Sequence, residues 1–228
     1  MNARDLITRA GAGIVYILLI LLGVLGGRTT FLIVFGAILA TGLFEFYRMV
    51  EKDTFHAISK IFNISMGVLL FLSVFLFIEG IFLFALPVAI LVYLMILIAS
   101  SVFLRRQDIL HGIIYSVFGQ IYVTMPLGLL MLISYSYQSS LSGEGHDWVP
   151  VLALFVFIWI NDTAAYFIGS LIGKHKLIEH ISPKKSVEGF VAGILFTLLA
   201  SFFFARFYPE FSSAFWMGYA AVVALFGT

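Results

Sequence analysis

Long runs of apolar residues recur along the whole chain and are separated only by short polar segments. A run of about 20 apolar residues is long enough to cross a bilayer core roughly 30 Å thick as a helix. Because backbone groups in hydrocarbon must form their hydrogen bonds internally, and because the runs do not alternate, helices are favoured over a barrel. We therefore expect an all-α, polytopic membrane protein with about eight transmembrane helices, at residues 11–27, 30–48, 61–78, 81–104, 112–134, 149–171, 189–208 and 211–228.

The composition supports this expectation. Hydrophobic residues make up 62% of the chain and charged residues only 11%, whereas about 25% of the residues in a soluble domain are charged. No segment between the runs resembles a separate soluble domain, so we expect residues 1–228 to form one integral membrane domain. The chain has no cysteine, which excludes disulfides, thiolate catalysis and Cys-ligated zinc.

The basic residues predict an orientation. With a cytoplasmic N-terminus, eleven of the 13 Lys and Arg residues fall on the inner side, and only Arg28 and Arg206 fall outside. This asymmetry follows the positive-inside rule for short loops. We expect a multi-pass protein of the cytoplasmic (inner) cell membrane, with residues 161–189 facing the cytoplasm at their basic end. No nucleic-acid partner is expected.

Residues 161–189 interrupt the apolar pattern with polar and charged side chains. Asn161, Asp162 and Thr163 lie within the sixth run, in the inner-leaflet half of the membrane. A carboxylate facing lipid there would cost several kcal/mol, so Asp162 should face protein, a cavity or a cation. Oxygen ligands of this kind suit Mg²⁺, which makes Asp162 the candidate metal ligand. The alternative is an aspartate that only hydrogen-bonds to a neighbouring helix.

The loop that follows has the features of a phosphate site. Ser182 as N-cap and Pro183 as first helical residue predict a helix that resumes near Lys184. A helix N-terminus attracts anions, and Lys184 and Lys185 would add two positive charges there. Glu188 would pair with a lysine or hold a metal. The alternative is an ordinary interfacial cap with lysines that only set topology. The candidate substrate-binding residues are Asn161, Lys174, Ser182, Lys184, Lys185 and Glu188.

Two residues in other runs carry their own predictions. Pro126 lies in the middle of the fifth run and predicts a kink in that helix. Glu45 lies one turn before the cytoplasmic end of the second run. Either it reaches the interface and pairs with Arg48, or it supports the active site, and both interpretations stay open.

The segments NDTAAYFIG at 161–169, Gly173-Lys174 and ISPKKSVEG at 181–189 together resemble the phosphatidate cytidylyltransferase (CDP-diacylglycerol synthase) family, in order and spacing over residues 158–193. The resemblance implies an integral membrane enzyme of phospholipid biosynthesis. Such an enzyme joins CTP and phosphatidic acid, with Mg²⁺, to give CDP-diacylglycerol and diphosphate. It also implies catalytic roles for Asp162, which would bind magnesium, and for Lys184 and Lys185, which would bind phosphate. The common motif has Thr where this chain has Ser186. A homodimer is left open.

One departure from the family concerns its later signature, a Lys-Asp pair followed by a His-Gly-Gly segment that ends in an Asp-Arg-x-Asp run. That signature is absent from the 228 residues, and with it the acidic groups expected to hold the metals. We therefore expect a C-terminally truncated chain that inserts in the membrane and makes no CDP-diacylglycerol by itself.

Other functions stay open at this point. A CTP-dependent lipid kinase of polyprenol or phytol type would have a similar site and a different product, a phosphorylated alcohol. A membrane transporter would also place a carboxylate in a membrane helix, although two related halves are its usual mark. A purely structural membrane protein would have no use for Asp162.

Overall fold

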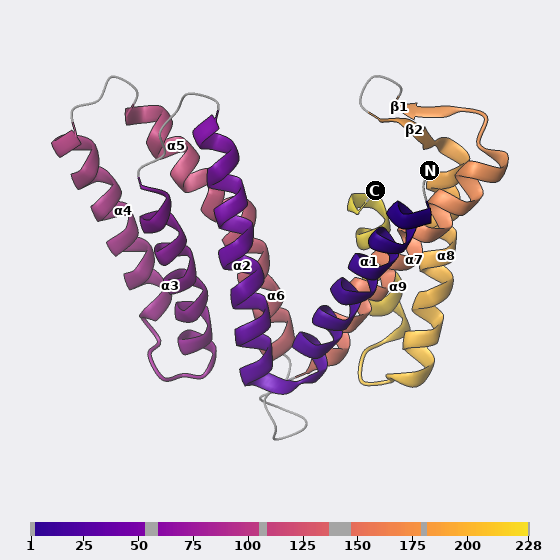
Figure 1. Cartoon of the computed structure of the whole chain (residues 1–228). Coiled ribbons are helices and arrows are strands. Elements are labelled where there is room, and N and C mark those ends of the chain that lie inside the picture. The colour runs from indigo at the N-terminus through magenta and orange to yellow at the C-terminus, as the bar shows by residue number, and fades with distance from the viewer. Residues whose placement is uncertain (1–2, 53–58, 105–108, 137–146, 179–181, 228) are drawn as a thin grey trace. The chain divides into compact units, whose positions relative to one another are not determined.

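The computed structural model describes residues 3–52, 59–104, 109–136, 147–178 and 182–227 (Figure 1). They form two compact units, Met1–Trp148 and Val149–Thr228, each of which is described by itself. The first unit contains α1 (Ala3–Leu25), α2 (Gly27–Lys52), α3 (Lys60–Ile78), α4 (Ala85–Leu104), α5 (Ile109–Gly119), the π-helix η1 (Gln120–Thr124) and α6 (Met125–Ser136). The second contains α7 (Trp148–Ile172), β1 (Lys176–Ile178), β2 (Ser182–Ser186), α8 (Val187–Phe207) and α9 (Ser213–Phe226).

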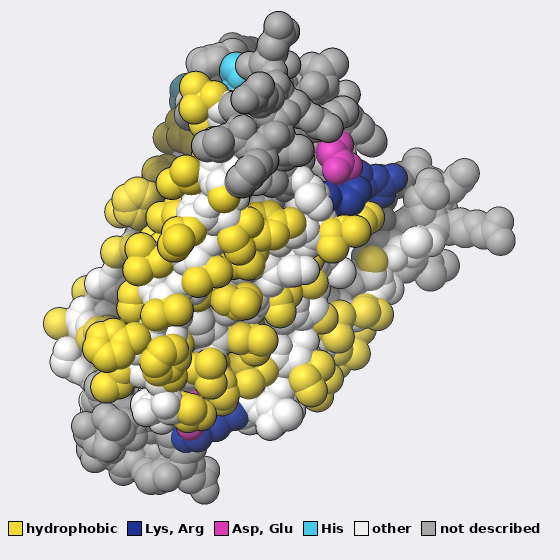
Figure 2. Space-filling view, turned by 90° about the vertical axis from the view of Figure 1, so that its left-hand side faces the viewer, with side chains coloured by type: hydrophobic (Ala, Val, Ile, Leu, Met, Phe, Trp, Pro, Cys, Tyr) yellow, Lys and Arg dark blue, Asp and Glu magenta, His cyan; other side chains and the backbone are white. Residues whose placement is uncertain are grey.

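Each of the eight apolar runs contains helix in its described part, although some run ends, such as residues 81–84, lie in turns. Five helices are long and apolar enough to cross a membrane: Gly27–Glu51, Lys60–Ile78, Leu110–Tyr135, Trp148–Ile172 and Val187–Phe207. Three shorter apolar helices, Gly11–Leu25, Ala85–Ser100 and Ser213–Phe226, correspond to the remaining runs. Figure 2 shows hydrophobic side chains across the middle of one face and charged side chains near its two ends. The expectation of an all-α polytopic membrane protein is confirmed, and the β1–β2 hairpin is a local addition to it.

The turn between α1 and α2 is made by glycine. Gly27 has a φ of +84°, a left-handed conformation that glycine adopts without steric cost. The turn brings Arg28 to Glu79 in the α3–α4 loop, with Nη1 and Oε2 2.9 Å apart. The ion pair places Arg28 at the same end of the helices as the α3–α4 loop within the first unit. The outer-side position predicted for Arg28 stays a prediction. The predicted inner residues Arg105 and Arg106 lie outside the described residues.

A π-helical turn directly precedes the part of the fifth run in which Pro126 was predicted to cause a kink. Proline has no N–H, and its ring clashes with the carbonyl one turn earlier. The five residues of η1 precede α6, and the N–H of Met125 bonds to the carbonyl of Gln120, five residues back. A widened turn of this kind is a common way to absorb such a clash within one helix. The fifth run therefore consists of α5, η1 and α6 in sequence.

A network of buried polar side chains joins the helices of the first unit. Asn63 donates to Ser116 Oγ at 3.0 Å and accepts from Tyr93 at 2.9 Å. Gln120 donates to the carbonyl of Asn63 at 2.8 Å. Buried polar groups are stable when they are paired in this way. The six members of the network are Tyr47, Asn63, Tyr93, Ser116, Gln120 and Thr124.

The core of the second unit is aromatic and lies between α7, α8 and α9. Phe157 of α7 meets Phe204 of α8 edge to face, with ring centroids 5.2 Å apart. Trp216 of α9 is fully buried, and its centroid also lies 5.2 Å from that of Phe204. The hydroxyl of Tyr219 donates to the carbonyl of Pro150 at 3.0 Å, which ties α9 to the start of α7. This core holds the helices that carry the polar segment.

Candidate functional site

Helices α7 and α8 approach each other closely at positions where glycine stands in place of a larger residue. A Cβ added at Gly193 would lie 2.5 Å from Asn161 Oδ1, and one added at Gly189 would lie 2.5 Å from the carbonyl oxygen of Ala165. Small residues at a helix contact in lipid allow the backbones to come this near. Asn161 is only 1% exposed as a result. It lies between the helices and packs α7 against α8, and its predicted part in substrate binding stays a prediction.

A two-stranded hairpin connects α7 to α8 and lies at the ends of these two helices (Figure 1). Strands β1 and β2 are antiparallel, with Lys176 opposite Ser186 and Ile178 opposite Ser182. The N–H of Val187 also bonds to the carbonyl of His175 at 2.9 Å. The hairpin therefore places the basic segment at the ends of α7 and α8.

The helix start predicted at Ser182 and Pro183 is wrong. Residues 182–186 are extended in β2, and α8 begins at Val187 with Ser186 as its N-cap. Ser186 Oγ accepts from the N–H of Gly189 at 3.2 Å. The pairing of β2 with β1 satisfies backbone groups that a helix would otherwise use, so the chain stays extended for four residues longer than the local signal indicates. Lys184 and Lys185 thus lie in a strand rather than at a helix N-terminus.

Ser186 is held in a space formed by three glycines. A Cβ at Gly169, Gly173 or Gly189 would lie 2.9, 2.6 or 3.1 Å from Ser186 Oγ. Side chains at these positions would displace the hydroxyl, so the glycines set how closely the junction of β2 and α8 packs on α7. Ser186 is 8% exposed.

A pocket of about 590 Å³ opens between α7, the hairpin and the start of α8. It combines one carboxylate, two lysines, three serines and two aromatic side chains. Positive charges and hydroxyls suit phosphate oxygens, and the carboxylate suits a hard cation beside them. The lining residues are Asp162, Ala165, Tyr166, Gly169, Ser170, Lys176, Leu177, Ser182, Lys185, Ser186, Gly189 and Phe190.

The pocket contains part of the predicted set. Asp162, Ser182 and Lys185 line it, and Asp162 is exposed to it rather than packed in the helix contact. Lys174 is exposed but does not line the pocket. The side chain of Lys184 lies outside the described residues. Their roles in binding stay predictions.

Several side chains that line the pocket were not among the predicted site residues, among them Tyr166, Ser170, Lys176 and Phe190. Tyr166 and Ser170 follow Asp162 at intervals of four and eight residues, so helical spacing could have placed them on its face. Lys176 lies opposite Ser186 because of the hairpin register, and no local signal indicates that register. Phe190 enters through the first turn of α8.

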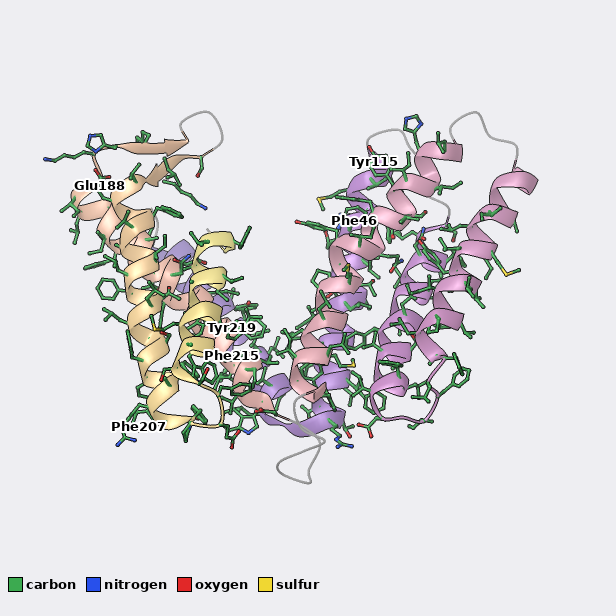
Figure 3. All side chains as sticks on the ribbon, turned by 180° about the vertical axis from the view of Figure 1, so that it is seen from behind. Phe46, Tyr115, Glu188, Phe207, Phe215 and Tyr219 are labelled. Carbon is green, nitrogen blue, oxygen red and sulfur yellow. The ribbon has the colours of Figure 1, made fainter. Side chains whose placement is uncertain are left out.

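Glu188 does not pair with a lysine side chain in the described part of the chain. Its Oε1 lies 2.7 Å from Nδ1 of His175, and the backbone N–H groups of Lys174 and His175 also donate to its carboxylate. Figure 3 shows Glu188 beside the hairpin. Glu45, in the first unit, pairs with Arg48 at 3.5 Å and is exposed, which favours the interfacial interpretation of that residue.

The oxygen donors of the pocket fit a magnesium ion that keeps several waters and takes its other oxygen ligands mainly from the phosphates of a bound molecule. Among the described residues, no group of three or more His, Asp or Glu could enclose a metal. Mg²⁺ in nucleotide sites usually binds one or two carboxylates and keeps its remaining positions for waters and phosphate oxygens. Asp162 supplies one such carboxylate, next to Ser182 and Ser186 in the same lining.

Comparison with known proteins identifies relatives. The sequence model of the cytidylyltransferase family matches residues 7–228. The phosphatidate cytidylyltransferase of Staphylococcus saprophyticus is 34% identical over 121 residues, which is 53% of this chain and 45% of that protein. The protein of the same name from Aquifex aeolicus is 54% identical over 59 residues, 25% of this chain and 22% of the relative. Each match thus spans less than half of the relative's length.

Proposed function

Because this chain belongs to the cytidylyltransferase family, we propose that it takes part in the transfer of CMP from CTP to phosphatidic acid, which gives CDP-diacylglycerol and diphosphate. The names of the relatives support this choice of reaction. The observation that carries it is the pocket, which brings Asp162 together with Lys176 and Lys185 at the end of an apolar helix pair. A reaction between a soluble nucleotide and a lipid phosphate requires a charged pocket at the end of apolar helices.

In the proposed reaction, a phosphate oxygen of phosphatidic acid forms a bond to the α-phosphorus of CTP. The bond from that phosphorus to the diphosphate oxygen breaks, and the electron pair leaves with diphosphate. Such transfers need positioning and neutralised charge more than covalent help from the protein. Lys176 and Lys185 are positioned to bind the phosphates, with Lys184 a further candidate, while Ser182 offers a hydroxyl to the same oxygens.

Magnesium is part of this proposal. Asp162 would hold the ion, directly or through water, beside the phosphate oxygens. When bound, Mg²⁺ would neutralise charge on the diphosphate leaving group. The carboxylate of Asp162 would then fix the ion relative to the lysines, which lie across the pocket on the hairpin.

We also propose that the pocket faces the cytoplasm, where CTP is available. The multi-pass membrane character rests on the apolar helices, and the orientation rests on the distribution of Lys and Arg along the sequence. The N-terminus would then be cytoplasmic. A homodimer stays a prediction.

The product identifies the reaction. The full-length gene product, in mixed micelles with Mg²⁺, receives phosphatidic acid and an added polyprenol or phytol, with CTP labelled at the α-phosphorus in one reaction and at the γ-phosphorus in a parallel one. The proposal expects the α-label in a lipid that co-migrates with CDP-diacylglycerol. If instead the γ-phosphate is transferred to the added polyprenol or phytol and no CDP-lipid forms, the lipid-kinase alternative is correct and the proposal is wrong.

A further inference from the structure

Glu188 makes a set of contacts that no substrate or metal role requires. It lies in the first turn of α8, and its side chain is 23% exposed. Its carboxylate accepts from the N–H of Lys174 at 3.2 Å and from that of His175 at 3.3 Å, and it lies 2.7 Å from His175 Nδ1. Both oxygens are therefore engaged by the segment that leaves α7.

These contacts join two segments that lie on either side of the hairpin in the sequence. Residues 174 and 175 connect the end of α7 to β1, while Glu188 belongs to α8, on the far side of the hairpin. The carbonyl of His175 accepts in turn from the N–H of Val187 at 2.9 Å. His175 is thus fixed through both its N–H and its C=O to the first turn of α8.

The fixed segment leads directly to a pocket lysine. Lys176 follows His175, stands opposite Ser186 in the strand pair and lines the pocket, as does Lys185 from β2. Hydrogen bonds to a charged carboxylate are among the stronger hydrogen bonds in proteins. Loss of the carboxylate would leave the start of β1 less restrained. The orientation of Lys176, the next residue, would then no longer be fixed.

We propose that Glu188 is a positioning residue, which holds the backbone at 174–175 so that the hairpin lysines meet the phosphates of CTP. This inference rests on the proposed function, because it needs CTP to bind in the pocket. It replaces the expectation that Glu188 binds substrate or metal itself. His175 acts with Glu188 and supplies one of its contacts.

The test measures hydrogen exchange and CTP affinity on the same variants of the purified protein. Glu188→Ala should speed exchange at residues 174–176 and weaken CTP binding about tenfold, with an unchanged Mg²⁺ requirement. Glu188→Gln keeps an acceptor oxygen for the backbone N–H groups, so it should lie between Ala and the wild type. His175→Ala should have a smaller effect than Glu188→Ala. Glu51→Ala removes a carboxylate that pairs with Lys60 in the first unit and should change neither quantity.

The outcomes separate the two proposals. If wild-type protein binds no CTP, the proposed function fails and the positioning role fails with it, whatever the exchange data show. If wild-type protein binds CTP and Glu188→Ala binds it equally well, only the positioning role is wrong. If Glu188→Gln is as weak as Glu188→Ala and the Mg²⁺ requirement rises in both, Glu188 is a metal ligand and the inference is overturned.

Discussion

At the scale of single residues, the proposed chemistry depends on one carboxylate and the lysines that face it. Asp162 is exposed on α7 and lines the pocket with Lys176 and Lys185. A carboxylate at this depth in an apolar helix is costly unless water or a cation reaches it. The pocket provides a space in which water or a cation can reach the carboxylate of Asp162.

The first prediction concerns Asp162→Asn in the full-length gene product. The amide cannot neutralise a cation, so turnover should fall by about 100-fold or more, as when other electrostatic groups of active sites are removed. Expression and thermal stability should not change, because the side chain is exposed. Thr163→Val is the matched control, since Thr163 is the exposed neighbour that does not line this pocket. Near-normal turnover in Asp162→Asn would make Asp162 a structural residue.

The residue types of the site could be predicted from the sequence better than their local geometry. Asp162 stands out because charge is rare within apolar runs, and Lys185 because its segment is basic. The sequence predicted the start of α8 at Ser182-Pro183, whereas the N-cap in the structure is Ser186. The pairing of β1 with β2 decides between them, and that pairing depends on contacts across the hairpin that local propensity does not contain.

The helix cap gives a second prediction. Ser186→Ala removes the hydroxyl that accepts from the N–H of Gly189, which should cost about 1 kcal/mol of stability. Ser182→Ala removes no cap and should cost less. Thermal unfolding in detergent compares the two variants. A larger loss in Ser182→Ala would restore the helix start predicted from the sequence.

At the scale of elements, the contact between α7 and α8 determines where the pocket can form. Hydropathy predicts both helices because length and apolar character suffice to indicate a membrane span. It does not predict how near they come, which depends on Gly189 facing the backbone of Ala165. The π-helical turn before Pro126 is a similar case, since the sequence predicted a kink at this proline and not a widened turn before it.

The third prediction tests that contact. Gly189→Ala would place a Cβ 2.5 Å from the carbonyl oxygen of Ala165. The helices must separate to accommodate it, at a cost of about 1–3 kcal/mol. Gly218→Ala in α9 is the control, because a Cβ there meets nothing within 4 Å, and it should be neutral or stabilising by up to about 1 kcal/mol. Equal unfolding temperatures for the two variants would contradict the close packing.

At the scale of the whole molecule, the described residues form two compact helical units, and each predicted apolar run contains helix. The order of the apolar helices followed from hydropathy. The arrangement within each unit did not, because it depends on specific pairs such as Arg28 with Glu79 and on the buried polar network of the first unit. One domain over residues 1–228 stays a prediction.

The orientation gives the fourth prediction. The chain has no cysteine, so single cysteines can be introduced without other changes. Lys174 and Glu210 are exposed and flank α8, whose 21 residues span about 31 Å. In oriented vesicles, Lys174→Cys should react with an impermeant maleimide only from the cytoplasmic side and Glu210→Cys only from the other. Reaction of both from one side would overturn the topology.

The most direct test of the account compares CTP binding by two variants, each of which replaces one lysine in the segment that connects α7 to α8. Lys185 lines the pocket, whereas Lys174 is exposed outside it. Lys185→Ala should weaken the binding of radiolabelled CTP by about tenfold at low salt, and less at high salt because ions screen the charge. Lys174→Ala should bind CTP as the wild type does. Equal losses in both variants would mean that the segment attracts CTP by charge alone, and the pocket would not be the binding site.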